Sequence, residues 1–436
     1  MAVPTRFRRL RAAALGGALL VALPLTAGSA AQATGAPPDH PATPAAPDWV
    51  NGWQGSPTAG GTFDHDSCPA DTGLDDQTVR NIVPLSTSGS TVRIRVSNAF
   101  GQAPLTVGAA SVAVAAQGAA TAPGTLRPLL FAGRPDVLVA QGGEALSDPV
   151  RLDVRALQRL SVSVFLPGTT GPATQHNNSR ETNYLAAADH TGDVDPASFG
   201  TPISCWLFAS GVDVQADPSV IGTVVALGDS ITDGDQSTIN ADQRYPDWLA
   251  RRFAALAGPK LAVSNAGIGG NELLHNRVPE LFGISAPARL PRDVLTQAGV
   301  RAVVLNEGIN DIGAESAQAG DVIGVYEQLI AQAHAAGLPI YGTTLVPFGG
   351  SNAVYGGSYG TADADAQRRA VNDWIRSGPF DGVIDFDAAL RDPGDTSRLL
   401  PAYDSGDHLH PGDAGYRAMA EAVDLQMLLQ GARTAR

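Results

Sequence analysis

The sequence predicts an α/β fold whose parallel sheet is covered on both faces, preceded by a β-sandwich or jelly roll. Three observations support this fold class. From about residue 49 to 214 apolar and polar positions alternate with period two, between turns rich in glycine and proline. After residue 218 five short β-branched runs alternate with helical patterns. The chain has 436 residues, enough for two domains of ordinary size.

The first residues are typical of an export signal. Four arginines at positions 6, 8, 9 and 11 precede the apolar run "AAALGGALLVALPLTA", and small residues follow it. A membrane anchor needs about 20 apolar residues, whereas this run is shorter and is interrupted by glycine and proline. We therefore predict a secretory signal peptide over 1–33, a flexible leader over 34–47, and a secreted protein without a stable membrane anchor.

Charge and cysteine content limit the partners and the compartment. The formal net charge of −14 argues against nucleic acid as a partner. Cys68 and Cys205 are the two cysteines of the chain, and in an exported protein such a pair is expected to form a disulfide. Two unpaired buried thiols remain the alternative, because the sequence cannot show whether the two Cα atoms approach each other.

The predicted β-sandwich domain spans 48–215. In "TVRIRVSNAF" the residues Val92, Ile94 and Val96 share one face, and "RLSVSVFLPG" alternates in the same way. No catalytic spacing joins the three histidines of this domain, which are His65, His176 and His190. The stretch "HNNSRETNY" therefore predicts a polar surface loop and not a metal site.

The second predicted domain spans 219–430. Its expected strands are "TVVAL", "LAVSN", "AVVLN", "LPIYGTTLV" and "VIDFD". In the expected helix "RYPDWLARRFAALA" one face carries Tyr245, Trp248, Leu249, Phe253 and Leu256. Strands that alternate with helices form a parallel sheet covered on both sides. Ligands of such sheets bind outside the carboxyl ends of the strands, so the residues that follow the strands are the candidates for chemistry.

Polar residues follow these strands in an order that suits acyl transfer. Ser230 follows the first strand, "NAGIGGN" with Gly270 the second, and "NEGIND" with Asn310 the third. Near the C-terminus, "DHLHPGDAGY" carries Asp407 and His410. A nucleophile, two places for oxyanion donors and an Asp/His pair are the groups that acyl transfer requires.

Four ordered blocks, "GDSITDG", "NAGIGGN", "GIND" and "DHLHP", resemble those of the GDSL or SGNH hydrolases over roughly 223–425. The resemblance implies a three-layer αβα fold of the flavodoxin-like type and a serine esterase. It also implies a role for each matched residue: Ser230 as nucleophile, Gly270 and Asn310 in the oxyanion hole, and Asp407 and His410 completing the triad. The earlier segment "VRIRVSNAFGQAPLTVG" is similar to the N-terminal domain of such hydrolases in secreted actinobacterial proteins.

The chemistry of these residue types supports the same roles. A serine hydroxyl needs a base, for which His410 Nε2 is the candidate, and Asp407 can reach the other ring nitrogen. The backbone N–H groups of Ser230 and Gly270 and the side-chain amide of Asn310 would hold the oxyanion.

Some polar residues admit other interpretations. Ser230 could merely cap the following helix. We expect Asp229 to hold the turn and Asp311 to orient the "GIND" loop. His408 competes with His410 as the base, but the Asp-x-x-His spacing favours His410.

No metal or organic cofactor is expected. "GIGGN" lacks the lysine of a P-loop and the spacing of a dinucleotide fingerprint. "DHLH" has no further ligand cluster nearby, and we expect His275 and His334 on the surface or on helices.

The expected substrate is an ester of a small molecule or a carbohydrate, and a short or soluble acyl ester is favoured. Two segments could line an acyl pocket or could simply pack: "ELLHNRVPELFG", with Leu273, Leu274 and Phe282, and "PFGGSNAVYGGSYG", with Phe348, Tyr355 and Tyr359. Neither is a long apolar lid. A carbohydrate O-deacetylase, a lipase or phospholipase, and a non-catalytic carbohydrate-binding or adhesion protein remain alternatives. We expect a monomer.

Overall fold

Two antiparallel sheets form the strand-rich N-terminal part of the chain. The computed structural model describes residues 48–62, 67–277 and 280–435. The predicted signal peptide, the leader and His65 lie outside the described residues. The first sheet has the order β1-β15-β3-β8 with β9 also paired to β3, and the second the order β13-β12-β2-β10-β5-β6. Two strand pairs, β4 with β7 and β11 with β14, lie beside them.

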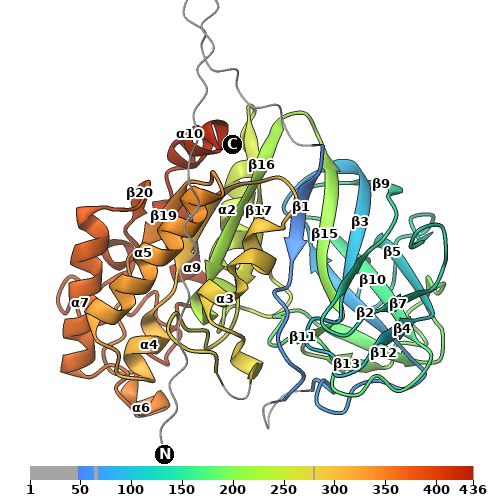
Figure 1. The fold of residues 1–436 in the computed structure, drawn as a ribbon, viewed down its shortest axis with the longest axis horizontal. Coiled ribbons are helices and arrows are strands. Elements are labelled where there is room, and N and C mark those ends of the chain that lie inside the picture. Colours follow the sequence, from blue (N-terminus) through green and yellow to red (C-terminus); the bar gives the residue numbers. More distant parts are fainter. Residues whose placement is uncertain (1–47, 63–66, 278–279, 436) are drawn as a thin grey trace, which may run out of the picture. The chain divides into compact units, whose positions relative to one another are not determined.

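The strands of this part have the bounds β1 Val50–Gln54, β2 Gln77–Pro84, β3 Gly89–Ser97, β4 Leu105–Val107, β5 Ala109–Val114, β6 Arg127–Pro128, β7 Val137–Val139, β8 Glu144–Leu146, β9 Val150–Val154, β10 Arg159–Leu166, β11 Gln175–His176, β12 Asn183–Ala187, β13 Thr201–Ile203, β14 Trp206–Leu207 and β15 Ala209–Ala216. Figure 1 shows them in blue and green.

The predicted alternation builds one core between the two sheets. Alternate residues of β3 and β10 are fully buried and belong to the same cluster: Val92, Ile94, Val96, Leu160, Val162, Val164 and Leu166. Cys68 and Cys205 form a disulfide beside this core, as expected from the sequence. Burial of apolar side chains from both sheets is what holds this part together.

A five-stranded parallel sheet follows, and each of the five predicted runs overlaps one strand, although the run "VIDFD" continues into helix α8, Phe386–Leu390. Their bounds are β16 Val220–Gly228, β17 Lys260–Gly267, β18 Val300–Asn306, β19 Ile340–Thr343 and β20 Gly382–Ile384. The spatial order is β17-β16-β18-β19-β20, the doubly wound order of flavodoxin-like sheets. The order reverses between β16 and β18, so the carboxyl ends of these two strands mark the expected ligand site.

Helices cover both faces of this sheet (Figure 1). Their bounds are α1 Ser230–Asp233, α2 Tyr245–Ala254, α3 Ala286–Leu290, α4 Ile309–Gly313, α5 Ala319–Ala335, α6 Asn352–Tyr355, α7 Ala362–Ser377, α8 Phe386–Leu390, α9 Asp413–Ala422 and α10 Leu425–Thr434, with a 3₁₀ turn at Glu280–Phe282 and a π turn at Pro291–Leu295. Helix α9 contacts both α2 and α8, and helix α5 contacts both α3 and α7. On α2 the predicted face is buried at Tyr245, Leu249 and Phe253. No helix among the described residues is long and apolar enough to cross a membrane.

The strand-rich part and the parallel sheet contact each other directly, and the described residues belong to one compact unit. Asn51 of β1 donates from its backbone N–H to Thr223 Oγ1 at 3.0 Å and from its side chain to Gln297 at 2.9 Å. Ser264 of β17 donates to Gln54 Oε1 at 2.6 Å. Buried polar bonds of this kind hold two surfaces in one orientation.

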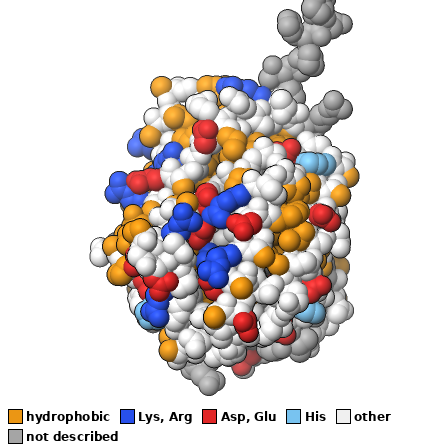
Figure 2. Space-filling view, turned by 90° about the vertical axis from the view of Figure 1, so that its left-hand side faces the viewer, with side chains coloured by type: hydrophobic (Ala, Val, Ile, Leu, Met, Phe, Trp, Pro, Cys, Tyr) orange, Lys and Arg blue, Asp and Glu red, His pale blue; other side chains and the backbone are white. Residues whose placement is uncertain are grey.

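The face formed by α5 and α7 mixes acidic and basic side chains, as Figure 2 shows. On α7, Arg369 pairs with Asp365 at 3.0 Å, and Arg376 pairs with Asp387 at 2.6 Å. Among the described side chains of this face the arginines are thus interspersed with carboxylates, unlike the continuous basic stripe of a nucleic-acid-binding surface.

Candidate active site

Ser230 is the first residue of the short helix α1, directly after β16. The N-cap is Asp229, whose carboxylate accepts a hydrogen bond from the backbone N–H of Ile231 at 2.9 Å. Ser230 is therefore not the cap, and its hydroxyl is available for another bond. Asp229 holds the turn, as expected, and its burial raises the pKa of its carboxyl above the usual range.

A chain of two hydrogen bonds joins Ser230 to His410 and Asp407. His410 Nε2 lies 2.8 Å from Ser230 Oγ, and His410 Nδ1 lies 2.7 Å from Asp407 Oδ2. The other carboxylate oxygen of Asp407 accepts the backbone N–H groups of Leu409 and His410 at 2.9 and 2.8 Å. His408 points elsewhere, because its Nδ1 pairs with Asp404 at 2.6 Å.

The charges around His410 favour its protonated form. Burial by itself lowers the pKa of His410, but the hydrogen bond to Asp407 and the charges of Asp235 and Asp229 more than offset burial, so this pKa is raised. Asp235 Oδ2 lies 3.8 Å from His410 Nε2. Burial would raise the pKa of Asp407, but its bond to His410 holds it well below the usual range. Asp407 therefore stays ionised while His410 titrates.

A pH dependence follows from this raised pKa. Only neutral His410 can accept the proton of Ser230, so kcat/KM for an ester is expected to fall as the pH drops through the pKa of His410 in the free enzyme. Because that pKa is raised, the midpoint of the acid limb should lie above about 6.5, the ordinary histidine value. A pH profile of kcat/KM measures it, and a midpoint below the ordinary value would contradict this electrostatic account.

Gly270 and Asn310 follow the two neighbouring strands, β17 and β18, and so lie at the same edge of the sheet as Ser230. Gly270 has a φ of +71°, and a Cβ there would lie 2.3 Å from the Phe282 ring. Glycine is therefore required by the backbone conformation and by the ring, besides any need for close approach of a substrate.

The side-chain amide of Asn310 is held at both ends. Its Nδ2 donates to the backbone carbonyl of Asn271 at 2.9 Å, and its Oδ1 accepts from the hydroxyl of Tyr359 at 2.7 Å. An amide carries two N–H bonds, so this arrangement leaves the second N–H in a fixed direction. Asp311 acts on the neighbouring loop, because its carboxylate accepts the backbone N–H groups of Leu273 and Leu274.

Most of the side chains considered for an acyl pocket have other contacts. Leu273 and Phe348 are buried in the core, and Phe282 lies against Gly270. Tyr355 donates from its hydroxyl to Asp407 Oδ2 at 2.9 Å, and Tyr359 reaches Asn310. The sequence showed two tyrosines in a glycine-rich loop but gave no signal of these partners.

The prediction of a polar surface loop for "HNNSRETNY" is wrong. His176 is buried, and its Nε2 lies 2.9 Å from Asp233 Oδ1, on the helix that begins with Ser230. Asn178 donates to Asp235 Oδ1 at 3.1 Å, and Arg180 donates to the carbonyl of Ser237. The physical reason is that these polar groups find buried partners in the segment that follows Ser230. No local sequence pattern indicates such distant partners.

One group of three side chains among the described residues could hold a metal ion. The ligand atoms of Glu272, His275 and Asp311 lie within 4.8 Å of one another. However, Glu272 already pairs with Arg277 at 3.0 Å, and Asp311 accepts the backbone bonds described above. His275 is exposed, as expected. Two of the three side chains thus already contact other groups of the protein.

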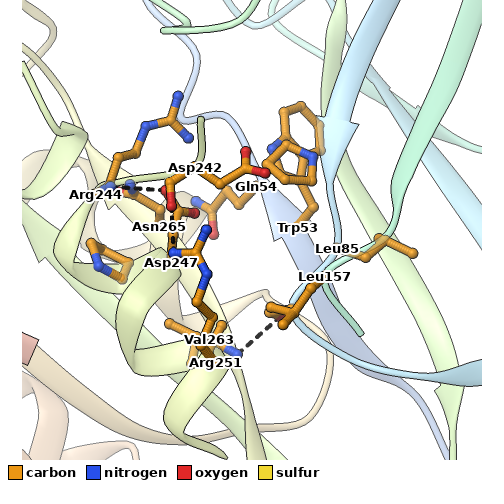
Figure 3. A pocket seen from close by; sticks show the side chains of 14 residues that line it. Trp53, Gln54, Leu85, Leu157, Asp242, Arg244, Asp247, Arg251, Val263 and Asn265 are labelled. Atoms are coloured by element: carbon orange, nitrogen blue, oxygen red, sulfur yellow. Dashed lines mark hydrogen bonds between the residues drawn. The ribbon is translucent and has the colours of Figure 1, made fainter. Parts of the chain in front are cut away.

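A cavity of about 70 Å³ lies between the strand-rich part and α2, away from the triad residues. Figure 3 shows its lining, in which Arg244 is the N-cap of α2, Asp247 lies in the first turn of α2 and Arg251 in its last turn, and Trp53 comes from β1. Ligand sites for organic molecules are usually several times larger. The cavity contains none of Ser230, His410 or Asp407 and is not the place for an ester.

A comparison with known protein families agrees with these blocks. A sequence model of the GDSL-like lipase/acylhydrolase family matches residues 226–418. No curated protein matches the chain significantly.

Similar solved structures include a carbohydrate acetylesterase family member from Sinorhizobium meliloti, with 18% identity, 48% of this chain and 99% of that chain covered, and a TM-score of 0.39. The lipase/acylhydrolase from Enterococcus faecalis has 20% identity, 48% and 96% coverage, and a TM-score of 0.37. The M. smegmatis aryl esterase has 16% identity, 46% and 95% coverage, and a TM-score of 0.36. The family match carries the assignment: residues 226–418 are a GDSL-like lipase/acylhydrolase domain, and this part of the chain is a serine ester hydrolase domain of the GDSL/SGNH type.

Proposed function

We propose that this protein is a secreted esterase that cleaves short-chain or soluble acyl esters through a Ser230-His410-Asp407 triad. The observation that carries the proposal is the hydrogen-bonded chain from Ser230 Oγ through both nitrogens of His410 to Asp407. This is the geometry in which a base removes the serine proton and a carboxylate fixes the ring tautomer.

The proposed reaction proceeds through an acyl-enzyme. Ser230 Oγ bonds to the carbonyl carbon while its proton passes to His410 Nε2, and the oxyanion is held by the N–H groups of Ser230, Gly270 and Asn310. The bond to the alcohol then breaks, and the alcohol leaves with the proton from His410. Water attacks the acyl carbon, gives a proton to His410, and releases the acid as Ser230 regains its proton.

Two features support a short acyl group on a neutral substrate. Leu273 and Phe348 pack into the core instead of lining a long apolar channel. Asp235 lies beside His410, and its negative charge would repel an anionic substrate.

Export is part of the proposal. The arginine-led apolar run predicts a signal peptide, and the Cys68–Cys205 disulfide suits an oxidising compartment. Mass spectrometry of the protein from culture medium should give an N-terminus near residue 34.

The first test is hydrolysis of nitrophenyl esters from acetyl through butyryl and decanoyl to palmitoyl. We expect the highest kcat/KM at acetyl or butyryl, and no turnover above background for Ser230→Ala. An optimum at palmitoyl would favour the lipase alternative, and activity confined to acetylated carbohydrates would favour the deacetylase. Activity that survives Ser230→Ala would remove this serine from the mechanism.

A further inference from the structure

One loop contacts both the acid of the triad and the oxyanion asparagine. We call residues 348–360 the tyrosine loop; it contains α6 and ends just before α7. Its two tyrosines, Tyr355 and Tyr359, lie against each other with ring centroids 5.6 Å apart. Phe348 anchors the loop in the core, with its ring 6.4 Å from that of Tyr359.

Tyr355 shares its acceptor with the catalytic imidazole. Its hydroxyl donates to Asp407 Oδ2 at 2.9 Å, and the same oxygen lies 2.7 Å from His410 Nδ1. The Tyr355 ring also packs edge-on against His410, with centroids 5.8 Å apart. A second donor on that oxygen fixes the carboxylate orientation and draws off part of the negative charge that stabilises the imidazolium.

Tyr359 acts on the other side of the site. Its hydroxyl donates to Asn310 Oδ1, and its ring lies where a Cβ at Gly313 would approach within 2.3 Å. Without this bond the amide of Asn310 could rotate about its terminal torsion, since the bond from Nδ2 to Asn271 would be its only anchor among the hydrogen bonds described above.

We propose that Tyr355 and Tyr359 are positioning residues for ester hydrolysis: Tyr355 sets the strength of the Asp407–His410 pair, and Tyr359 aims the Asn310 amide at the oxyanion. The inference rests on the proposed function. One loop thus positions two groups that come from different parts of the chain: the base His410 and the Asn310 amide that stabilises the oxyanion.

The two tyrosines should have different kinetic signatures. Tyr355→Phe leaves Asp407 with one donor fewer, so the pKa of His410 should rise and the acid limb of kcat/KM should move up by about half a pH unit. Tyr359→Phe should lower kcat about tenfold with little change in KM and no shift of the acid limb, because the loss affects the transition state. Phenylalanine keeps each ring, so both variants are expected to fold.

A substrate-independent readout separates this inference from the proposed substrate. With diethyl p-nitrophenyl phosphate, Ser230 Oγ bonds to phosphorus, p-nitrophenolate leaves, and the serine proton passes to His410. The released nitrophenolate counts reactive sites, so each rate is expressed per folded enzyme. If no ester is hydrolysed but Ser230 is phosphorylated at the normal rate, only the proposed substrates are contradicted.

Tyr341→Phe is the matched control. Tyr341 lies on β19, outside the site, and its hydroxyl donates to the backbone carbonyl of Met427 at 3.2 Å. This variant should change neither rate nor pH profile. In the Asn310→Ala background, Tyr359→Phe should have no further effect on the rate. The inference is overturned for Tyr359 if the two losses multiply, and for Tyr355 if the acid limb stays in place or moves down.

Discussion

His410→Ala is expected to lower kcat for ester hydrolysis by about 10⁶-fold, the loss found when a serine hydrolase loses its base. The alanine variant leaves the Ser230 hydroxyl without the acceptor that now lies 2.8 Å away. It also removes the group that protonates the leaving alcohol. Ser230→Ala should cost about as much, and the double variant should be no slower than either single variant, because the residues act as a unit.

The matched control for this prediction is His408→Ala. His408 is two residues away on the same segment, but it pairs with Asp404 and is 42% exposed. Its removal should leave kcat within about twofold, since surface ion pairs contribute little. Steady-state kinetics on nitrophenyl acetate measure both variants. A His410→Ala enzyme that lost less than about a hundredfold, the lower end of the range for general-base catalysis, would exclude this base.

His176→Ala should destabilise the protein by about 3–5 kcal/mol, the cost of leaving a buried charge without its partner. Ser56 offers a carbonyl to Nδ1 at 2.9 Å and Asp233 a carboxylate oxygen to Nε2. A carbonyl can only accept, so Nδ1 donates to Ser56, and removal of the ring leaves buried Asp233 without this partner. The other oxygen of Asp233 has no hydrogen-bond partner among the described residues.

This loss should also reduce activity, because Asp233 ends the helix that Ser230 begins. The control is His190→Ala in the same part of the chain, whose pair with Asp193 is about one-third exposed on both sides. That variant should cost no more than about 1 kcal/mol. Urea unfolding gives both free energies. Equal losses of stability for the two variants would show that His176 does not stabilise α1.

A second variant distinguishes a lost pair from a lost side chain. Replacing both partners, as His176→Phe with Asp233→Leu, removes the buried charge and fills the space. The double variant should be more stable than His176→Ala. If it is less stable, packing at the site and not the unpaired charge causes the destabilisation.

Sequence reasoning reached the elements of the fold because their signals are local. β-branched runs predicted all five parallel strands, and period-two alternation predicted β3 and β10. It also named Ser230, Asp407 and His410, which the structure joins by hydrogen bonds. Each of these residues lies in a short sequence motif, which can be recognised without knowing which residues surround it in the folded protein.

The sequence by itself thus predicted the strands of the parallel sheet, a candidate disulfide pair and the candidate triad. Only the tertiary structure decided that "HNNSRETNY" contacts α1 and the residues after it, and that the tyrosine loop contacts the site. His176 and Asp233 are 57 residues apart, and Tyr355 and Asp407 are 52 apart. Such pairs arise when the chain folds back on itself, and a polar side chain carries no local mark of the distant partner that will satisfy it.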